Sequence, residues 1–191
     1  MRENNAPMQV RRESNRVHDA GPRRAFTLIE LIVVMVLIAI MAAVAVPAIG
    51  NLTSTRASTA ARQLARDLTF ARQQAGARGV TIWVVFDTAN ESYSILAESL
   101  QTPGLANALT ITDPATGQPF VQRFTSGDFV NVDLTSVSIG GVTGTHLGFD
   151  WLGRPVSSAG VVLASASSIS INNGALTIAI TPQTGFVTVQ L

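Results

Sequence analysis

The apolar residues of this chain follow three successive patterns, and each pattern predicts a different element. Residues 31–50 read LIVVMVLIAIMAAVAVPAIG and contain no charge. At about 1.5 Å per residue, a helix of this length spans about 30 Å, the thickness of a bilayer core. We therefore predict a membrane span here. The alternatives are a secretory signal peptide, whose apolar segment is usually about 7–15 residues, and a buried core helix.

Further along, apolar residues recur at three- and four-residue steps, as in an amphipathic helix whose apolar stripe must be covered. Arg62 and Arg66 fall on the opposite face, which favours a solvated surface over a phosphate-binding stripe. Gly76 and Gly79 are predicted to end the helix. One helix from Phe26 to Arg78 would be about 80 Å long. The stripe consists of Ala57, Ala60, Ala61, Leu64, Leu68, Ala71 and Ala75.

From Val80 onward apolar and polar residues alternate, which predicts β-strands. Asn90-Glu91 and Asn173-Gly174 are turn signals that predict two hairpins. A change of parity at Thr135-Ser136, between Val130 and Ile139, predicts a bulge or turn. Residues 98–128 are predicted to be loops with one or two short strands. The other predicted strands are residues 81–87, 92–96, 168–172, 175–181 and 186–191.

These patterns predict an α+β fold, in which a long N-terminal helix packs on a mostly antiparallel β-sheet domain. The 191 residues suit one domain with an appendage. The positive-inside rule places the N-terminus in the cytoplasm, because residues 11–25 contain five arginines and residues 51–70 only three. Everything after about Gly50 would then lie outside the cytoplasm.

Glu30 stands at the start of the apolar run, where a carboxylate is costly unless it has a partner or reaches the headgroup region. It belongs to the string Arg23-Arg24-Ala25-Phe26-Thr27-Leu28-Ile29-Glu30-Leu31. This string resembles the prepilin processing site of type IV pilins and type II secretion pseudopilins. The resemblance implies a leader of residues 1–25, cut by prepilin peptidase between Ala25 and Phe26, and N-methylation of Phe26. Ala25 stands where the family usually has glycine, and Met8 is a second candidate start beside Met1.

The same resemblance implies an assembly role for Glu30. Cleavage creates a cationic α-amine at Phe26, since such amines titrate near pH 8. The Glu30 carboxylate of one subunit could pair with the Phe26 amine of a neighbour, and in a low dielectric this pair would discriminate between registers. Pro47 is predicted to kink or loosen the helix, as prolines at a similar place do in pilins. The implied organisation is a leader (1–25), an assembly or transmembrane half-helix (26–50), an amphipathic half-helix (51–79) and a β-rich domain (80–191).

The order of the later segments narrows the resemblance. A Trp-bearing strand follows the helix, and Phe149-x-x-x-Gly153 precedes the closing strands. This is similar to the GspH/FimT class of minor pseudopilins and pilins. Some members on the FimT side bind DNA through a late Gly-Arg-x-Arg motif. Here the corresponding residues are Gly185-Phe186-Val187-Thr188, which lack both arginines, so no nucleic-acid partner is expected.

Composition argues against catalytic chemistry. The chain has no cysteine, which excludes disulfides and thiolate metal sites. His146 is the one histidine after residue 25, and a surface or hydrogen-bonded structural role is its more common explanation. The scattered acids show no EF-hand spacing, although a calcium site built from loop acids stays open. We expect no enzyme, no cofactor and no metal.

The function predicted from the sequence is that of a minor pseudopilin of a type II secretion system. It would be held in the bacterial inner membrane by a single span and assemble with other pilin subunits into a periplasmic pseudopilus that supports protein export. One alternative is a minor type IV pilin for pilus biogenesis, adhesion or DNA uptake. Another is a membrane-anchored binding module or enzyme with an accidental motif.

Overall fold

The computed structural model describes residues 26–190, without the side chains of residues 44–51. The predicted leader, with Met1, Met8 and Ala25, and the side chain of Pro47 therefore lie outside the described residues. The chain divides into two units, residues 1–44 and residues 45–191.

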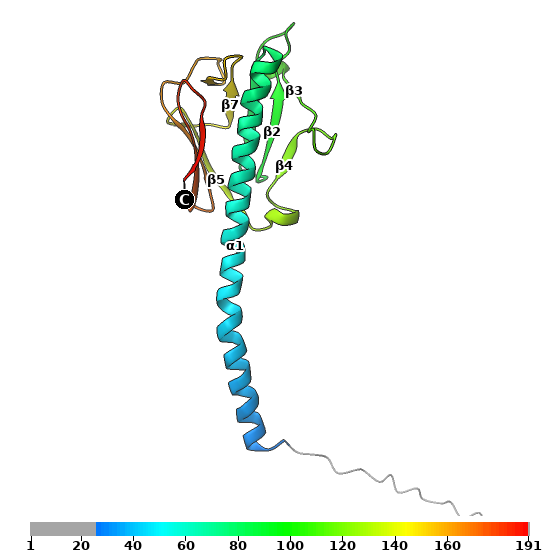
Figure 1. Cartoon of the computed structure of the whole chain (residues 1–191), viewed down its shortest axis with the longest axis vertical. Helices are drawn as coiled ribbons and strands as arrows, with labels where there is room; N and C mark the ends of the chain where they lie inside the picture. Colours follow the sequence, from blue (N-terminus) through cyan, green and yellow to red (C-terminus); the bar gives the residue numbers. More distant parts are fainter. Residues whose placement is uncertain (1–25, 191) are drawn as a thin grey trace, which may run out of the picture. The chain divides into compact units, whose positions relative to one another are not determined.

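One long helix, α1 (Leu28–Arg78), runs through both units (Figure 1). It begins after Thr27, whose hydroxyl oxygen accepts a hydrogen bond from the amide of Glu30 at 3.3 Å. It ends at Gly79, which has φ +68° and donates its amide proton to the carbonyl oxygen of Ala75 at 3.0 Å. A left-handed glycine is a common way to end a helix. The predicted helix is confirmed, but Gly76 lies inside its last turn and does not end it.

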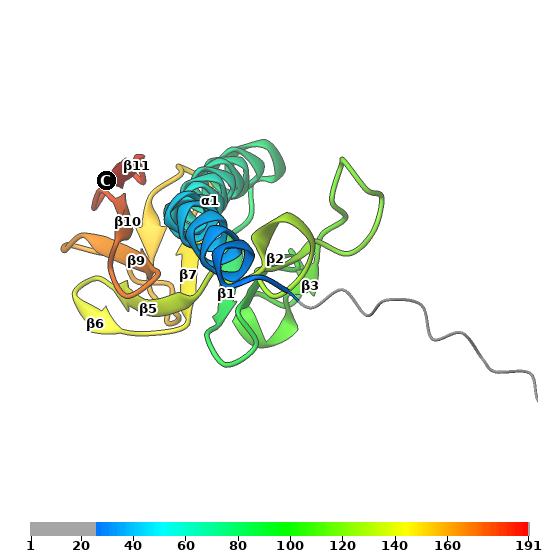
Figure 2. The same ribbon diagram turned by 90° about the horizontal axis from the view of Figure 1, so that it is seen from below.

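The β-strands of the second unit form two sheets, and every strand pair described is antiparallel (Figure 2). The first sheet has the order β3-β2-β1-β7-β8, and β4 also pairs with β2. Its strands are β1 (Ile82–Asp87), β2 (Ser92–Ala97), β3 (Leu109–Thr110), β4 (Val121–Arg123), β7 (His146–Phe149) and β8 (Pro155–Val156). Two 3-10 helices lie between its strands in the chain, η1 (Leu105–Asn107) and η2 (Gly127–Phe129).

The second sheet has the order β11-β10-β9-β5-β6. It contains both β9–β10 and β10–β11, so the predicted hairpin around Asn173-Gly174 and the closing strand are confirmed. The register of β5 shifts between Leu134 and Ser136, which confirms the predicted bulge. The strands are β5 (Leu134–Ile139), β6 (Val142–Thr143), β9 (Ser167–Ile171), β10 (Leu176–Ile180) and β11 (Val187–Gln190).

Two sequence-based expectations differ from the structure. The alternation from Val130 to Leu134 suggested strand, but β5 begins only at Leu134, and Asn131, at φ +69°, turns the chain just before it. No strand is predicted around His146, yet this segment forms β7 beside β1. A Cβ atom at position 148 would lie 2.7 Å from the ring of Trp83 on the paired strand β1, so only glycine fits there. Because Gly148 interrupts the apolar residues of β7, the sequence shows only a short apolar pattern for this strand.

The core of the second unit lies between α1 and both sheets. All seven residues of the predicted apolar stripe are at most 2% exposed, so the stripe is confirmed as the buried face of the helix. Burial of a leucine such as Leu64 or Leu68 contributes about 1.5–3 kcal/mol. The α+β class predicted from the sequence is therefore confirmed, with two sheets in place of one.

Candidate assembly site

The first half of α1 exposes apolar side chains on every side. From Phe26 to Met41 the large apolar side chains are between 46% and 78% exposed, and every described residue from 26 to 43 is classed as exposed. Since consecutive helix positions are 100° apart, such a run has no polar face. A helix that is apolar all round normally lies among other apolar groups. Its exposure here means that this unit supplies no covering of its own.

In the part of the chain that the structure describes, no helix combines the length and the apolar character needed to cross a membrane.

Glu30 is the single charged residue between Phe26 and Thr55, and it is exposed in the first turn of α1. Thr27 and Glu30 have the spacing of a capping box, and the hydrogen bond from the Glu30 amide to the Thr27 hydroxyl oxygen is half of that motif. A carboxylate in the first turn also interacts favourably with the helix dipole. Glu30 thus has a local role in starting the helix, which sequence reasoning missed although Thr-x-x-Glu is a recognisable signal.

The predicted site residues form no constellation within one chain. Phe26 and Glu30 lie four positions apart at the start of α1, and both are exposed. Ala25 and the side chain of Pro47 are outside the described residues. The cleavage, methylation, assembly and kink roles therefore stay predictions.

A buried polar group fastens the second half of α1 to the first sheet. The Tyr93 hydroxyl of β2 donates to the Asp67 carboxylate at 2.5 Å, and the Gln63 side-chain amide donates to both carboxylate oxygens at 3.1 and 3.2 Å. Burial raises the pKa of Asp67, and burial together with the neighbouring carboxylate raises the pKa of Tyr93 well above its usual value. The sequence analysis missed this contact. Its one signal was that Asp67 continues the row of Ala60, Leu64 and Ala71 at three- and four-residue steps.

A second polar group shapes the loop between β7 and β8. One carboxylate oxygen of Asp150 accepts the amides of Leu152 and Arg154 at 3.0 and 2.8 Å, and the other binds the Arg154 guanidinium at 2.7 Å. Phe149 is fully buried at the start of this loop, and Gly153 has φ +78° and lies against Arg72. The Phe149-x-x-x-Gly153 pattern therefore defines a fixed loop conformation.

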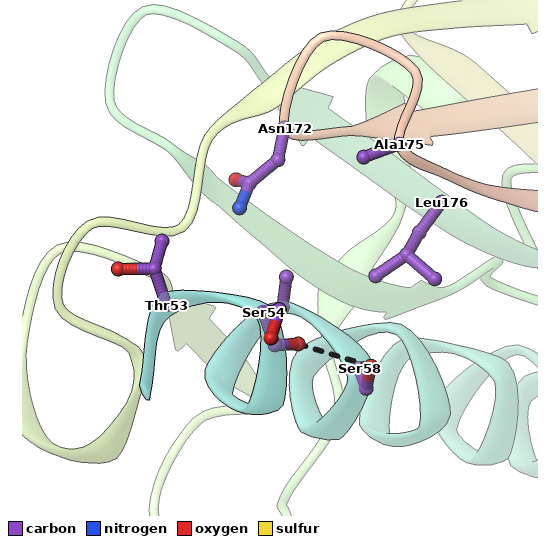
Figure 3. Close-up of a pocket in the computed structure, with 7 residues that line it drawn as sticks. Thr53, Ser54, Ser58, Asn172, Ala175 and Leu176 are labelled. Atoms are coloured by element: carbon purple, nitrogen blue, oxygen red, sulfur yellow. Dashed lines mark hydrogen bonds between the residues drawn. The ribbon is translucent and has the colours of Figure 1, made fainter. Parts of the chain in front are cut away.

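A groove of about 430 Å³ lies between the second half of α1 and the turn that joins β9 to β10 (Figure 3). The Asn172 side chain points toward it, but its oxygen already accepts the amide of Asp133 at 2.8 Å. The Ser58 hydroxyl donates to the carbonyl of Ser54 at 3.0 Å. None of the lining residues is titratable, so the groove offers no acid–base chemistry. They are Thr53, Ser54, Ala57, Ser58, Asn172, Ala175 and Leu176.

His146 shows no catalytic arrangement. It is half-buried at the start of β7, and its Nδ1 lies 2.8 Å from the Thr145 hydroxyl. Within residues 26–190, no three histidine, aspartate or glutamate side chains gather in a way that could hold a metal ion.

Comparison with known proteins agrees with this description. Residues 22–46 match the family described as the prokaryotic N-terminal methylation motif, and residues 60–185 match the family described as type II transport protein GspH. A comparison with curated protein sequences gives no match.

Solved structures with a similar fold include two minor subunits. The minor pseudopilin EpsH from the type 2 secretion system of Vibrio cholerae is 12% identical, with a TM-score of 0.49 over 71% of this chain and 96% of that chain. The type IV minor pilin FimU of Pseudomonas aeruginosa is 17% identical, with a TM-score of 0.44 over 70% of this chain and 92% of that chain. Because the GspH match covers 126 of the 191 residues and follows a methylation motif at the N-terminal end, the chain belongs to the GspH family.

Proposed function

We propose that this chain is a minor pseudopilin of a type II secretion system. In this function it is held in the inner membrane by residues 26–50, with the N-terminus in the cytoplasm and the β-rich domain (80–191) in the periplasm. It joins a pseudopilus at or near its tip and supports protein export. The amphipathic half-helix (51–79) connects the two parts, and the leader (1–25) is removed by prepilin peptidase.

One observation carries this proposal. The first half of α1 is apolar on all sides and exposed, and Glu30 is its only charge. A surface of this kind is stable in a bilayer or among the apolar helices of other subunits. Because no described part of the chain covers it, the covering must come from outside, and both a membrane and a filament core would supply it.

In the assembled state, Glu30 pairs with the amine of Phe26 on a neighbouring subunit. Phe26 precedes α1 and Glu30 lies in its first turn, both are exposed, and Glu30 forms no ion pair among the described residues, so both are accessible to a neighbour. In an apolar surrounding an unpaired carboxylate is strongly disfavoured, whereas a paired one selects a single helix register.

The N-terminal residue and mass of the protein from its native membrane test the processing step. We expect a chain that starts at methylated Phe26. An intact leader, or a cut beyond Ala48, would overturn the proposal and favour a membrane-anchored binding module.

Substitution of Glu30 tests the assembly step. Glu30→Gln keeps a residue that fits the capping box but removes the charge, whereas Glu30→Ala removes both. We expect both variants to insert in the membrane and to fail in assembly, measured as subunit recovered in sheared filaments. If Glu30→Gln assembles like the wild type, the role of Glu30 is local capping and the pairing mechanism is wrong.

The alternative function is that of a minor type IV pilin, which the methylation motif and the apolar half-helix fit equally well. Deletion of the gene separates the two. Loss of protein export with normal surface pili supports the pseudopilin, and loss of pili with normal export supports the pilin. A gel shift at low salt should show no DNA binding, because Arg123 and Arg154 are the only cations beyond Arg78.

A further inference from the structure

Three large apolar side chains are exposed at the end of the second unit where α1 ends. Trp151 is 60% exposed, Leu152 55% and Phe186 59%, and we name these three residues the terminal patch. Trp151 and Leu152 lie in the β7–β8 loop, and Phe186 lies just before β11. The two segments touch, because a Cβ added to Gly185 would overlap the carbonyl oxygen of Gly153. Exposed apolar groups gathered in this way are typical of protein interaction sites.

The terminal patch is held in place by its own loops. The Asp150 carboxylate accepts the amides of Leu152 and Arg154, and the amide of Gly185 donates to the carbonyl oxygen of Thr181 at 3.0 Å. The carbonyl oxygen of Trp151 also lies against the last turns of α1, 3.6 Å from where a Cβ of Gly76 would be. A fixed surface loses little conformational entropy on binding, which favours affinity.

Two cationic side chains lie at the same end as the terminal patch. Arg72 packs against both Gly153 and Gly185, and Arg78 is exposed in the last turn of α1, whereas the Arg154 guanidinium is paired with Asp150. The Asp150 carboxylate at this end already accepts hydrogen bonds from its own loop. Aromatic residues and arginine dominate the energetic centres of protein interfaces. The surface therefore fits a partner with an apolar centre and an acidic rim.

The acidic cluster at the β1–β2 turn of a second copy does not supply that partner surface. The acids Asp87, Glu91 and Asp133 gather at the β1–β2 turn and the start of β5, and the Glu91 carboxylate accepts the amide of Leu134. The exposed large apolar residue beside them among the described residues is Val130, at 38%. This end thus has the acidic charge but lacks an apolar centre of matching size.

We propose that the terminal patch docks onto a different pilin-type subunit, through a surface on that subunit with an apolar centre and an acidic rim. This inference rests on the proposed function. It adds the surface of contact and the chemistry of the neighbour to it.

Site-specific cross-linking in cells with the complete machinery tests the docking. Because the chain has no cysteine, Leu152→Cys places the one thiol in the patch, where a thiol-reactive photo-cross-linker is attached. We expect an adduct with another pilin-type subunit, identified by mass spectrometry. Leu109→Cys, on β3 and 75% exposed, is the matched control and should not give this adduct.

A second substitution, made in the same cells, tests whether Phe186 and Arg78 contribute to the docking. Adding Phe186→Ala or Arg78→Glu to Leu152→Cys should lower the adduct about tenfold, as expected for residues at the energetic centre of an interface. Val161→Ala, an exposed apolar change outside the patch, should leave it unchanged.

Adducts from Leu152→Cys only with a second copy, with lipid or with an exported protein would overturn the inference, as would no adduct. The N-terminal residue and the recovery in filaments are measured in the same cells. A processed and assembled protein without the adduct contradicts the docking alone, and an unprocessed protein contradicts the proposed function as well.

Discussion

The two halves of α1 differ in what covers their apolar residues. Between Leu28 and Met41 the large apolar side chains are exposed on all sides. Between Ala57 and Ala75 the apolar residues form one stripe and are at most 2% exposed. The same backbone hydrogen bonding runs through both, so helix formation itself does not separate them.

The difference lies in the partner that each half requires. An apolar stripe on one face of a helix can be covered by sheets of the same chain, as the second half of α1 shows. A surface that is apolar all round cannot be covered by one small domain. The first half of α1 is therefore the part of the molecule that depends on other molecules, and the second half holds the fold together.

Truncation of a core leucine should give the largest difference in unfolding free energy between the two halves of α1. Leu64→Ala is expected to lower the free energy of unfolding by about 2–5 kcal/mol, because it leaves a cavity in a fully buried site. Ile38→Ala, at 61% exposure in the first half, should leave that free energy nearly unchanged. Urea unfolding of the full chain in mild detergent, followed by tryptophan fluorescence, measures both. Equal losses would mean that the first half also stabilises the second unit.

The second-largest loss of unfolding free energy is expected when the Tyr93 hydroxyl, which joins the helix to the first sheet, is removed. Tyr93→Phe leaves the buried Asp67 carboxylate without its shortest hydrogen bond, which should cost about 1–3 kcal/mol in the free energy of unfolding. Ser58→Ala, which removes only a hydroxyl bonded within the helix, should change it by less than about 0.5 kcal/mol. The same unfolding measurement distinguishes the two. A Tyr93→Phe protein as stable as the wild type would show that this contact does not fasten α1.

The end of the helix offers a smaller test with opposite signs. Gly79→Ala should destabilise by about 1 kcal/mol, because a Cβ disfavours φ +68°. Gly76→Ala should be neutral or stabilise by up to about 1 kcal/mol, since it is helical and its Cβ would have 3.6 Å of space to the nearest atom. Thermal unfolding of both variants measures the difference. The opposite order would mean that the helix ends earlier than Gly79.

The smallest expected effect is a dependence of stability on pH. The pKa of Asp67 is raised by burial, so the folded state holds its proton more tightly than the unfolded state. Its contribution is therefore fully present below the unfolded pKa of about 3.9 and is lost as the pH rises through the folded pKa. The unfolding free energy of the wild type should therefore rise relative to that of Asp67→Asn as the pH falls. This comparison removes the contributions of Glu91, whose pKa is also raised, and of Asp87, whose pKa is lowered by its hydrogen bonds to Asn90. A difference that does not change with pH would mean that Asp67 titrates normally.

Short-range periodicity was sufficient for the parts of the fold that repeat. The stripe from Ala57 to Ala75, the hairpins at Asn90-Glu91 and Asn173-Gly174, and the bulge beside Thr135 were all predicted from spacing within a few residues. Such patterns reflect local geometry, in which side chains repeat every 3.6 residues in a helix and every two in a strand. The candidate assembly residues Phe26 and Glu30 likewise came from one continuous motif.

Contacts between distant segments were beyond the sequence. The short strand β7, with Gly148 facing Trp83, has too little pattern to be recognised alone, and it forms because β1 and β8 pair with it. Asp67 and Tyr93 are 26 positions apart, and the segments bearing Leu152 and Phe186 meet only through the contact of Gly153 with Gly185. The sequence by itself thus determined the long helix, the two hairpins, the closing strand and the apolar character of the first half-helix on all its sides. The tertiary structure decided the division into two sheets and the terminal patch, because both depend on segments far apart in the chain packing side by side.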